Sequence, residues 1–432
     1  MSKRTFSNTL YTNDNLYVLS GMNSATVDLI YLDPPFNSKR TYSAPVGSKA
    51  AGASFKDMWT WKDVDEYYLN TLADQFPTLA KYIASVGAVH SKPMMAYLTY
   101  MSQRIVEMHR ILKETGMLYL HCDPTASHYL KSLLDGIFGK NNFRNEIIWC
   151  YNIGGKSKKD FANKHDTIYR YSKSRNYTFN ADKIRMAMTP HKQDKSGKNY
   201  GGKMGIDKKG RQYVEKQGTR DSEGNYKYYR YYLDEGKIPE DWWIDINALQ
   251  PSSKERTGYP TQKPLVLLKR IIQASSNEGD IVMDPFCGCA TTCVAAQQLG
   301  RRWIGIDIEK QATKILVQRL SDDAGFFKDF VATDQIPKRT DLHEVLPSES
   351  VKQRLYKEQN GKCNGCQEEF KIWNLTIDHI IPKTKGGGDY YENYQLLCAN
   401  CNSIKGNRPM EFLRMKIEKR EQMMKTQIIF GE

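Results

Sequence analysis

The stretch Val27-Asp28-Leu29-Ile30-Tyr31-Leu32-Asp33-Pro34-Pro35-Phe36 decides the fold class of this chain. Its apolar run, residues 27–32, predicts a buried strand, and the prolines after Asp33 end that strand in a rigid turn. Other strand-like runs lie at 117–122, 146–150, 280–285 and 303–308, and apolar side chains at helical spacing lie at 95–113, 124–138, 261–275 and 291–299. Strands that alternate with helices predict an α/β fold in which a parallel sheet carries helices on both faces.

The turn at the end of the first strand suits chemistry on the amine of a nucleobase. Such an amine is a poor nucleophile because its lone pair is delocalised into the ring. Two hydrogen-bond acceptors, the Asp33 carboxylate and the Pro34 carbonyl, would localise that pair, and the adjoining Pro35 would hold them in place. Phe36 offers a flat face on which a flipped-out base can stack. A Pro-Pro turn after a strand is also common as plain structure, so the turn alone does not assign a function.

A second unit, a strand followed by a loop and a helix, suits a nucleoside cofactor. Its loop is Asp284-Pro285-Phe286-Cys287-Gly288-Cys289-Ala290-Thr291, whose small residues let the backbone approach a cofactor while the helix N-terminus favours a carboxylate. Asp307, nineteen residues after Gly288, ends the next strand, where it can accept hydrogen bonds from ribose hydroxyls. Because the loop lacks GxGxxG and no hydride-transfer site is evident, an NAD-dependent oxidoreductase ranks well below a methyltransferase.

Together these residues resemble the beta-class amino-methyltransferases of DNA, over about residues 8–320. Further motifs appear in the family's order, namely Asn13-Asp14-Asn15-Leu16, the segment 55–61, Tyr119-Leu120-His121-Cys122-Asp123, the segment 145–149, Lys164-His165-Asp166, Phe179-Asn180 and Tyr259-Pro260-Thr261-Gln262-Lys263-Pro264. The resemblance implies a Rossmann-like methyltransferase sheet and a base pocket formed by Asp33, Pro34, Pro35 and Phe36. The implied cofactor is S-adenosylmethionine, held by Asp14, Thr261, Lys263, Asp284, Phe286, Gly288, Thr291 and Asp307.

The resemblance also bears on the target base. Motifs of the Asp-Pro-Pro type occur in the family mainly with adenine, whereas cytosine-modifying members more often have Ser in place of Asp. N6 of adenine is therefore favoured, and N4 of cytosine stays open. One position departs from the family, because Ala290 stands where members often have Gly; we expect its methyl group to crowd the cofactor slightly without abolishing binding.

The chain is strongly basic and rich in aromatic side chains. Lys and Arg total 63 against 49 Asp and Glu, a net charge of +14, together with 27 Tyr and 7 Trp. This combination suits a polyanion with stackable bases, although a merely basic enzyme would show the same balance. Residues 181–230 hold 13 Lys and Arg against 6 Asp and Glu, which is +7, half of the net charge. We predict that 181–250 is the target-recognition insertion facing double-stranded DNA, with a solvated loop as the alternative.

Two cysteine pairs predict a metal site near the C-terminus. Cys363-x-x-Cys366 and Cys398-x-x-Cys401 are separated by 31 residues, a spacing that suits one tetrahedral Zn²⁺. Four thiolates leave no coordination position for water, so this zinc would be structural. Buried thiols without a metal are the alternative, but they would not require paired spacing.

The segment around these cysteines resembles the HNH nucleases over roughly residues 356–407. The resemblance rests on Thr376-Ile377-Asp378-His379-Ile380-Ile381-Pro382, Gly386-Gly387-Gly388, Glu392-Asn393 and Cys401-Asn402-Ser403-Ile404-Lys405-Gly406. It implies a small zinc-supported ββα-metal domain in which His379 is the general base and Asn393 orients it. Asp378 and Asn402 would supply oxygen ligands for Mg²⁺ or a similar cation; some members have His at the position of Asn402.

The predicted division of the chain has four parts. A methyltransferase domain covers 1–320 and includes the insertion, a polar linker covers 321–350, the HNH domain covers 351–410, and a C-terminal helix covers 411–432. The N-terminus has no apolar h-region, and no apolar run reaches the ~18 residues that cross a bilayer. We therefore expect a cytosolic protein with no membrane partner, in which the nine cysteines are metal ligands or buried thiols.

The leading hypothesis is an enzyme with two activities on DNA, modification by the large domain and cleavage by the small one, as in restriction and modification. One alternative keeps the methyltransferase and makes the HNH segment a DNA-docking module. Another is a non-catalytic DNA-binding protein, which the intact motifs around Asp33 and His379 disfavour. RNA as a substrate and the oligomeric state, with a homodimer among the options, stay open.

Overall fold

The computed structural model describes most of the two predicted domains. The described residues are 8–37, 40–45, 48, 50–51, 54–57, 72, 76–152, 158–187, 203–309, 313–316, 318–319, 330–342 and 345–429. The motif segment at 55–61 therefore lies largely outside the described residues, as do parts of the basic insertion and of the predicted linker.

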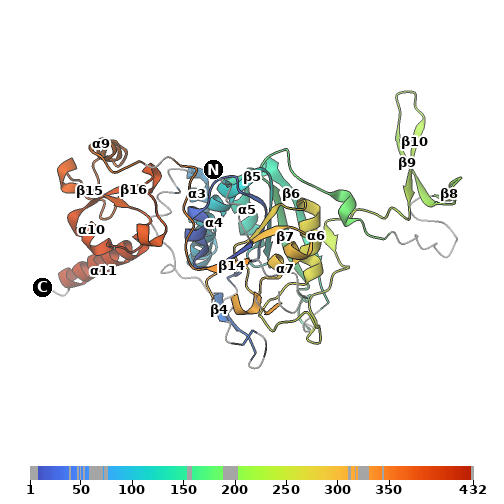
Figure 1. Cartoon of the computed structure of the whole chain (residues 1–432), viewed down its shortest axis with the longest axis horizontal. Helices are drawn as coiled ribbons and strands as arrows, with labels where there is room; N and C mark the ends of the chain where they lie inside the picture. Colours follow the sequence, from blue (N-terminus) through green and yellow to red (C-terminus); the bar gives the residue numbers. More distant parts are fainter. Residues whose placement is uncertain are drawn as a thin grey trace.

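The large domain is built on a nine-stranded sheet in the order β11-β6-β7-β5-β2-β12-β13-β1-β14 (Figure 1). In that order the strands are β11 (Trp242–Trp243), β6 (Phe143–Cys150), β7 (His165–Ser172), β5 (Leu112–Cys122), β2 (Val27–Leu32), β12 (Ile281–Asp284), β13 (Arg302–Asp307), β1 (Asn8–Thr12) and β14 (Phe330–Thr333). Neighbouring strands from β5 to β14 run parallel, whereas β7 runs antiparallel to both β5 and β6. The predicted parallel sheet is thus mixed at one edge.

Helices cover both faces of this sheet, as predicted. They are α1 (Asn15–Gly21), α3 (Pro77–Val89), α4 (Lys92–Ile111) and α5 (Ser127–Phe138) on one face, and α6 (Leu265–Ser275) and α7 (Thr291–Gln298) on the other. Side chains alternate along β2, so Ile30 and Leu32 join the first apolar core while Leu29 and Tyr31 join the second. A strand buried on both faces must be apolar throughout, which is why residues 27–32 form a near-continuous hydrophobic run.

Several predicted element boundaries differ from the structure by a few residues, among them the start of β5, which lies at Leu112 rather than at residue 117. Helix α6 begins at Leu265 rather than at residue 261, because Thr261 has a φ of 60°, outside the range of a right-handed helix, and Pro264 is the N-cap. The polar segment at 321–350 is not merely a linker, since it contains the edge strand β14 paired with β1. Both features depend on contacts with distant parts of the chain.

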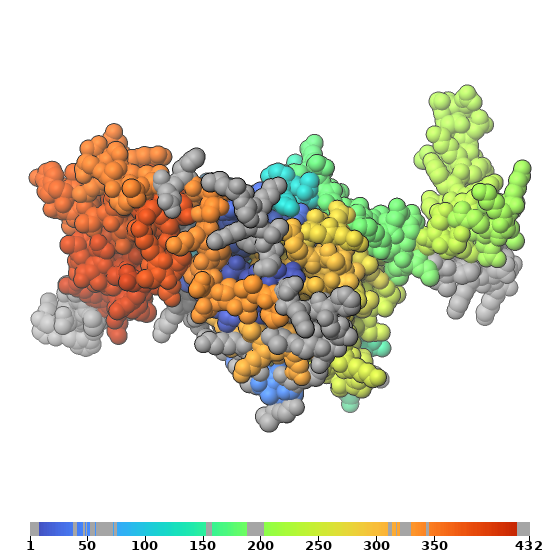
Figure 2. All heavy atoms as spheres, in the orientation of Figure 1, coloured from blue at the N-terminus to red at the C-terminus, as the bar shows by residue number. Residues whose placement is uncertain are grey.

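The basic insertion contains a sheet of its own. Strands β8 (Lys203–Ile206), β9 (Gln212–Arg220) and β10 (Tyr226–Tyr232) pair antiparallel, with β9 in the middle. The turn between β9 and β10 is held by Asp221, whose Oδ1 accepts hydrogen bonds from the backbone N–H of Glu223 and of Asn225. This sheet, called the arm below, stands away from the large domain as a separate protrusion (Figures 1 and 2). A second small pairing joins β3 (Arg40–Ser43) to β4 (Ser54–Asp57) near the site.

The C-terminal domain has the expected ββα arrangement at its centre. Its elements are α9 (Glu349–Glu358), the antiparallel strands β15 (Leu375–His379) and β16 (Tyr394–Cys398), α10 (Ala399–Lys405) and α11 (Met410–Ile429). Short 3₁₀ helices occur in both domains at Lys140–Asn142, Ala181–Ile184, Ile372–Asn374, Lys383–Lys385 and Tyr391–Asn393. The C-terminal domain has its own apolar core around the cysteines.

The connecting segment is fastened to both domains. Thr340 bonds to Asn23 through both backbone and side chain, and Tyr394 of the C-terminal domain donates its hydroxyl to the carbonyl of Val345 at 2.8 Å. Gly21 lies so close to Pro337 that an added Cβ would meet the Pro337 carbonyl oxygen at 2.0 Å. The two domains therefore lie next to each other along this segment (Figure 2). Within the part of the chain that the structure describes, no helix has the length and apolar character needed to span a membrane.

Candidate active sites

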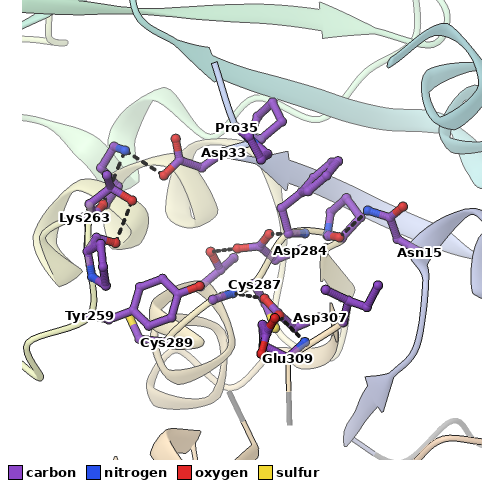
Figure 3. Close-up of a pocket in the computed structure, with 18 of the residues that line it drawn as sticks. Asn15, Asp33, Pro35, Tyr259, Lys263, Asp284, Cys287, Cys289, Asp307 and Glu309 are labelled. Carbon is purple, nitrogen blue, oxygen red and sulfur yellow. Dashed lines mark hydrogen bonds and ion pairs between the residues drawn. The ribbon is translucent and has the colours of Figure 1, made fainter. Parts of the chain in front are cut away.

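The carboxyl ends of three neighbouring parallel strands bring the predicted catalytic residues together. Asp33 follows β2, Asp284 ends β12 and Asp307 ends β13, and parallel strands end at the same edge of a sheet. These carboxylates line one cavity of ≈ 410 Å³ (Figure 3). All residues predicted for the base pocket and the cofactor site line this same cavity, namely Asp14, Asp33, Pro34, Pro35, Phe36, Thr261, Lys263, Asp284, Phe286, Gly288, Thr291 and Asp307.

Only one of the two Asp33 carboxylate oxygens has a hydrogen-bond partner among the described residues. Its Oδ2 lies 2.6 Å from the Lys263 ammonium, and both side chains are largely buried. Its Oδ1 is also buried and has no hydrogen-bond partner among the residues that the structure describes. A buried acceptor without a partner is costly, so this oxygen is suited to a donor brought by a ligand.

Lys263 occupies a different place from the one predicted for it. It was assigned to the cofactor site, and although it lines the shared cavity, its ammonium contacts Asp33 and lies 5.5 Å from the centre of the Phe36 ring. The ammonium therefore lies at the end of the cavity formed by Asp33 and Phe36. The turn itself is held from the other side, where the backbone N–H of Asn37 donates to Asp57 Oδ1 at 2.6 Å.

Asp307 closes the loop at the opposite end of the cavity. Its two oxygens accept hydrogen bonds from the backbone N–H of Gly288 and of Glu309, both at 2.8 Å. Burial raises the pKa of Asp307 to about 6. The loop also needs Gly288 itself, because φ is 49° there and an added Cβ would meet the Tyr259 ring at 2.8 Å.

Asp284 holds the beginning of the same loop. It accepts from the Phe286 N–H at 3.0 Å and from the Thr292 hydroxyl at 2.5 Å, and burial raises its pKa to about 7. These bonds fasten the loop to α7. Ala290, which departs from the family's Gly, has φ 58° and ψ 33° as the N-cap of α7, a left-handed conformation in which Gly alone is unstrained.

A buried arginine supports Asp14, the residue predicted to approach the cofactor's adenine ring. Arg104 donates to Asp14 Oδ1 at 2.9 Å and to Asn15 Oδ1 at 2.6 Å. Asn15 in turn donates to the carbonyl of Pro285, which ties α1 to the loop that follows β12. Arg104 was missed from the sequence, because an arginine in an amphipathic helix normally faces solvent and its partners lie about 90 residues away.

The four cysteines of the C-terminal domain converge as predicted. The sulfur atoms of Cys363, Cys366, Cys398 and Cys401 all lie within 4.8 Å of one another, and this is the group of metal-ligand type found among the described residues. Backbone N–H groups of Gly365 and Cys398 donate to the Cys363 sulfur at 3.3 and 3.2 Å. Hydrogen bonds from Cys401 and from the backbone lower the pKa of Cys363, as suits a thiolate ligand.

His379 is oriented by Asp389 and not by the predicted Asn393. His379 Nε2 lies 2.9 Å from Asp389 Oδ1, and Lys383 and Tyr394 also bond to that carboxylate. Hydrogen bonds from Lys383 and then from His379 lower the pKa of Asp389 to about 2. Asn393 bonds instead to the backbone of Ile381 and Gly388, so it braces the loop beside His379.

The predicted metal ligands Asp378 and Asn402 already have protein partners. Asp378 Oδ2 accepts from the buried Lys405 ammonium at 2.9 Å and from Gln395 at 2.8 Å. Asn402 donates its amide N–H to Thr376 at 3.0 Å. Lys405 belongs to a motif of the HNH resemblance but was given no role, and Asp389 is a functional candidate that sequence reasoning missed.

Two family models match the chain. One, described as DNA methylase, matches residues 27–318, and the other, described as HNH endonuclease, matches residues 363–408. The type II methyltransferase M.EcaI of Enterobacter cloacae is 33% identical over 282 residues, which are 57% of this chain and 62% of that protein. The DNA adenine methyltransferase YhdJ of Escherichia coli (strain K12) is 26% identical over 347 residues, which are 78% of this chain and 93% of that protein.

Among solved structures, the cytosine-N4-specific PvuII DNA methyltransferase is similar over 74% of this chain and 89% of its own, with 13% identity and a TM-score of 0.44. The chain thus spans somewhat less than two thirds of M.EcaI but nearly all of YhdJ. The DNA methylase match extends over more than half of the chain, and it includes the strand, turn and loop that form the cavity. This chain belongs to the DNA methylase family and carries a C-terminal HNH domain.

Proposed function

We propose that the large domain methylates an exocyclic amine of a base in double-stranded DNA, with S-adenosylmethionine as the methyl donor. The observation that carries the proposal is Asp33 Oδ1, a buried acceptor without a partner among the described residues, in a cavity that also contains Gly288 and Asp307. An amine N–H would satisfy that oxygen. Labelled methyl transfer from S-adenosylmethionine to unmethylated duplex DNA tests the proposal directly.

The residues present fit the cofactor. Asp307 can accept hydrogen bonds from ribose hydroxyls, and the cavity of ≈ 410 Å³ has the size of a small-molecule site. Carboxylates of Asp14, Asp284 and Asp307 around the cavity also suit a ligand that carries a positive sulfonium. When bound, S-adenosylmethionine would supply an electrophilic methyl group.

The chain's own residues then act on the base. Phe36 would stack on the flipped base, and Asp33 Oδ1 with the Pro34 carbonyl would accept the two amine hydrogens, so that the nitrogen lone pair is localised. Lys263 holds the Asp33 carboxylate in place through the contact with Oδ2. These residues would present the amine nitrogen in line for a single displacement onto the methyl group that the bound cofactor would supply, and the proton that the nitrogen loses would pass to water. The large domain's step would use no metal.

We further propose that the base is adenine, modified at N6. The Asp at position 33 supports this choice, and the similar YhdJ bears the name of a DNA adenine methyltransferase. Cytosine at N4 is the alternative. Sequencing that detects modified bases in DNA from cells expressing this chain would identify the base and the site together.

The pH dependence of cofactor binding follows from Asp307. Because burial raises the pKa of Asp307 to about 6, its carboxylate is protonated in a growing fraction of empty sites as the pH falls through that value. A protonated carboxyl accepts poorly, so we expect S-adenosylmethionine to bind about tenfold more weakly at pH 5 than at pH 8. Calorimetric titration across this range measures the effect. Asp307→Asn should bind weakly with a flatter pH profile, and an unchanged affinity in the native protein between pH 5 and 8 would contradict the assignment.

We propose that the arm binds the DNA. Strands β8 to β10 with their turns, residues 203–232, contain eight Lys and Arg against four Asp and Glu. Tyr226, Tyr228, Tyr229 and Tyr231 are 44–60% exposed along the edge strand β10. Exposed cations next to exposed aromatic rings suit phosphates and bases, and a two-stranded ribbon has the width of a DNA major groove.

A triple variant tests the arm. Lys208, Lys216 and Lys227 are exposed there, and their replacement by Ala should weaken DNA binding and reduce the slope of log K against log salt by about 2–3. Methyl transfer at saturating DNA should change little. The matched control replaces Lys81, Lys92 and Lys140, which are exposed on or beside helices of the large domain. Equal salt slopes for the two triple variants would disprove a specific role for the arm.

For the C-terminal domain we propose metal-dependent DNA cleavage, supported by a structural zinc. The four converging sulfur atoms support zinc, and the His379–Asp389 pair resembles a general base with its orienting carboxylate. Mg²⁺ would be held by oxygens of Asp378 and Asn402, with DNA phosphate and water completing its shell. DNA in which the base carries the methyl group would then escape cleavage by the C-terminal domain, as in restriction and modification. Incubation of mixed-sequence DNA with Mg²⁺, with and without S-adenosylmethionine, separates this proposal from a domain that only binds DNA.

A further inference from the structure

Three buried polar side chains and the half-buried Tyr151 form a continuous series directly behind the base pocket. Tyr31 bonds to His121 Nδ1 at 2.9 Å, His121 Nε2 bonds to Asp166 Oδ2 at 2.9 Å, and the Tyr151 hydroxyl donates to Asp166 Oδ1 at 3.0 Å. His121 is completely buried. The series links β2, β5 and β7 to the segment after β6, so it crosses the sheet at the level of the Asp33 turn.

The same histidine forms the backing of the pocket wall. The Phe36 ring stacks on the His121 ring, with 6.4 Å between the ring centres and 22° between the planes. Trp149 packs edge-on against His121 at 5.6 Å and is itself fixed by a hydrogen bond from its indole N–H to the carbonyl of Ile246. Tyr31 and Phe36 both line the cavity, whereas His121 lies one layer behind them.

The hydrogen-bond partners of His121 indicate which of its ring nitrogens carries a proton. The Asp166 carboxylate can only accept, and hydrogen bonds from His121 help to lower the pKa of Asp166 against the effect of its burial. Nε2 of His121 therefore carries a proton, and in a neutral imidazole Nδ1 accepts the Tyr31 hydroxyl. Both ring nitrogens are occupied, so the ring can neither flip nor tilt without losing a buried hydrogen bond.

We propose that His121, held by Asp166, is a positioning residue that fixes the Phe36 ring and the Tyr31 hydroxyl as the wall against which the target base is placed. This inference rests on the methyl transfer proposed above. It explains why the Tyr-Leu-His-Cys-Asp and Lys-His-Asp segments, far apart in sequence, meet behind the pocket. Three contacts then hold the Asp33 turn in place. Lys263 contacts the Asp33 carboxylate, Asp57 accepts a hydrogen bond from the Asn37 backbone, and the His121 ring stacks on the Phe36 ring.

A neighbouring tyrosine provides the comparison needed to separate positioning from plain stability. Tyr119 lies two residues before His121 on β5, is 2% exposed, and bonds through its hydroxyl to Ser275 at 2.7 Å. Neither Tyr119 nor Ser275 lines the cavity. Loss of this buried hydrogen bond should lower stability without moving the pocket wall.

The experiment compares Asp166→Ala, Asp166→Asn and Tyr119→Phe with the native full-length chain. For each protein we would measure the single-turnover rate of labelled methyl transfer from S-adenosylmethionine to unmethylated duplex DNA, the cofactor affinity by calorimetry, and Tm. We expect Asp166→Ala to slow transfer about 10- to 100-fold while the cofactor affinity stays within about twofold. Asp166→Asn should recover most of the rate, because its amide oxygen can still accept from His121 Nε2. Tyr119→Phe should lower Tm and leave the rate unchanged.

Three results would overturn the inference. These are an Asp166→Ala rate equal to that of Tyr119→Phe, a parallel loss of rate and cofactor affinity, or an Asp166→Asn variant as slow as Asp166→Ala. If Asp166→Ala does not fold, Tyr31→Phe replaces it in the experiment. Tyr31→Phe and Tyr119→Phe each remove one buried hydroxyl group, so they are matched in stability cost. Of these two variants, only Tyr31→Phe should slow methyl transfer. A native chain that transfers no methyl would contradict the proposed function itself, which is a distinguishable outcome.

Discussion

Replacing Asp33 with Ala should lower methyl transfer to duplex DNA by about 100- to 1,000-fold. The substitution removes the buried, unpartnered Oδ1 that is proposed to accept the amine hydrogen, and it leaves the Lys263 ammonium without the partner that it has at 2.6 Å. The effect should fall on the chemical step, so cofactor affinity should change much less than the rate. Incorporation of labelled methyl groups into DNA from a host without adenine methylation measures the rate.

The chain offers a matched control for this experiment. Asp28 lies on β2, the strand that ends just before Asp33, and it also pairs with a lysine. The Lys113 ammonium is 2.8 Å from the Asp28 carboxylate, which does not line the cavity. Asp28→Ala therefore breaks a similar ion pair without touching the site, and it should retain most of the transfer rate. An Asp33→Ala protein that transfers methyl groups as fast as the native chain would remove the proposed role of this carboxylate.

Replacing His379 with Ala should abolish metal-dependent cleavage while methyl transfer persists. General-base catalysis contributes about 100- to 10,000-fold, so the residual nicking of a supercoiled plasmid should fall below detection. His379 bonds to Asp389 and lies outside the group of four sulfur atoms, so the variant should keep its zinc. Nicking in the presence of Mg²⁺, together with the zinc content of the purified protein, measures both expectations.

The Asp33→Ala protein is the reciprocal control for the nuclease. Its methyl transfer should be strongly reduced and its C-terminal domain intact, so it should still nick plasmid DNA while His379→Ala still transfers methyl groups. Retained cutting by His379→Ala would exclude His379 as the base. If neither the native chain nor Asp33→Ala cuts any DNA in Mg²⁺, the domain that only binds DNA becomes the better description.

Local sequence was sufficient for those parts of the fold that each segment determines by itself. An apolar run ending in Asp33-Pro34-Pro35 could only be a buried strand followed by a turn, and that strand is β2. The paired spacing of Cys363 with Cys366, and of Cys398 with Cys401, likewise predicted the convergence of four sulfur atoms. The carboxyl edge of a parallel sheet then gathered Asp33 and Asp307, because parallel strands end on the same side.

Local sequence could not predict the partners of these residues. Lys263 was predicted to contact the cofactor. A sequence motif indicates that a residue lies near a site, but it does not show which atom a flexible four-carbon side chain contacts. The Lys263 ammonium contacts Asp33, 230 residues away in the chain. Asn393 was assigned to orient His379, yet Asp389 has that place. Strand β14 was taken for linker because an exposed edge strand needs little apolar character.

Taken by itself, the sequence determined the α/β class, the turn after β2, the loop between β12 and α7 and the cysteine cluster, since each of these depends on residue types at short and regular spacing. Only the tertiary structure decided which side chains pair across the sheet. The His121–Asp166 bond behind Phe36 and the ion pair of Lys405 with Asp378 are such features. The physical reason is that a buried polar contact is stabilised by the exclusion of water and by packing from distant strands, and no local pattern contains that information.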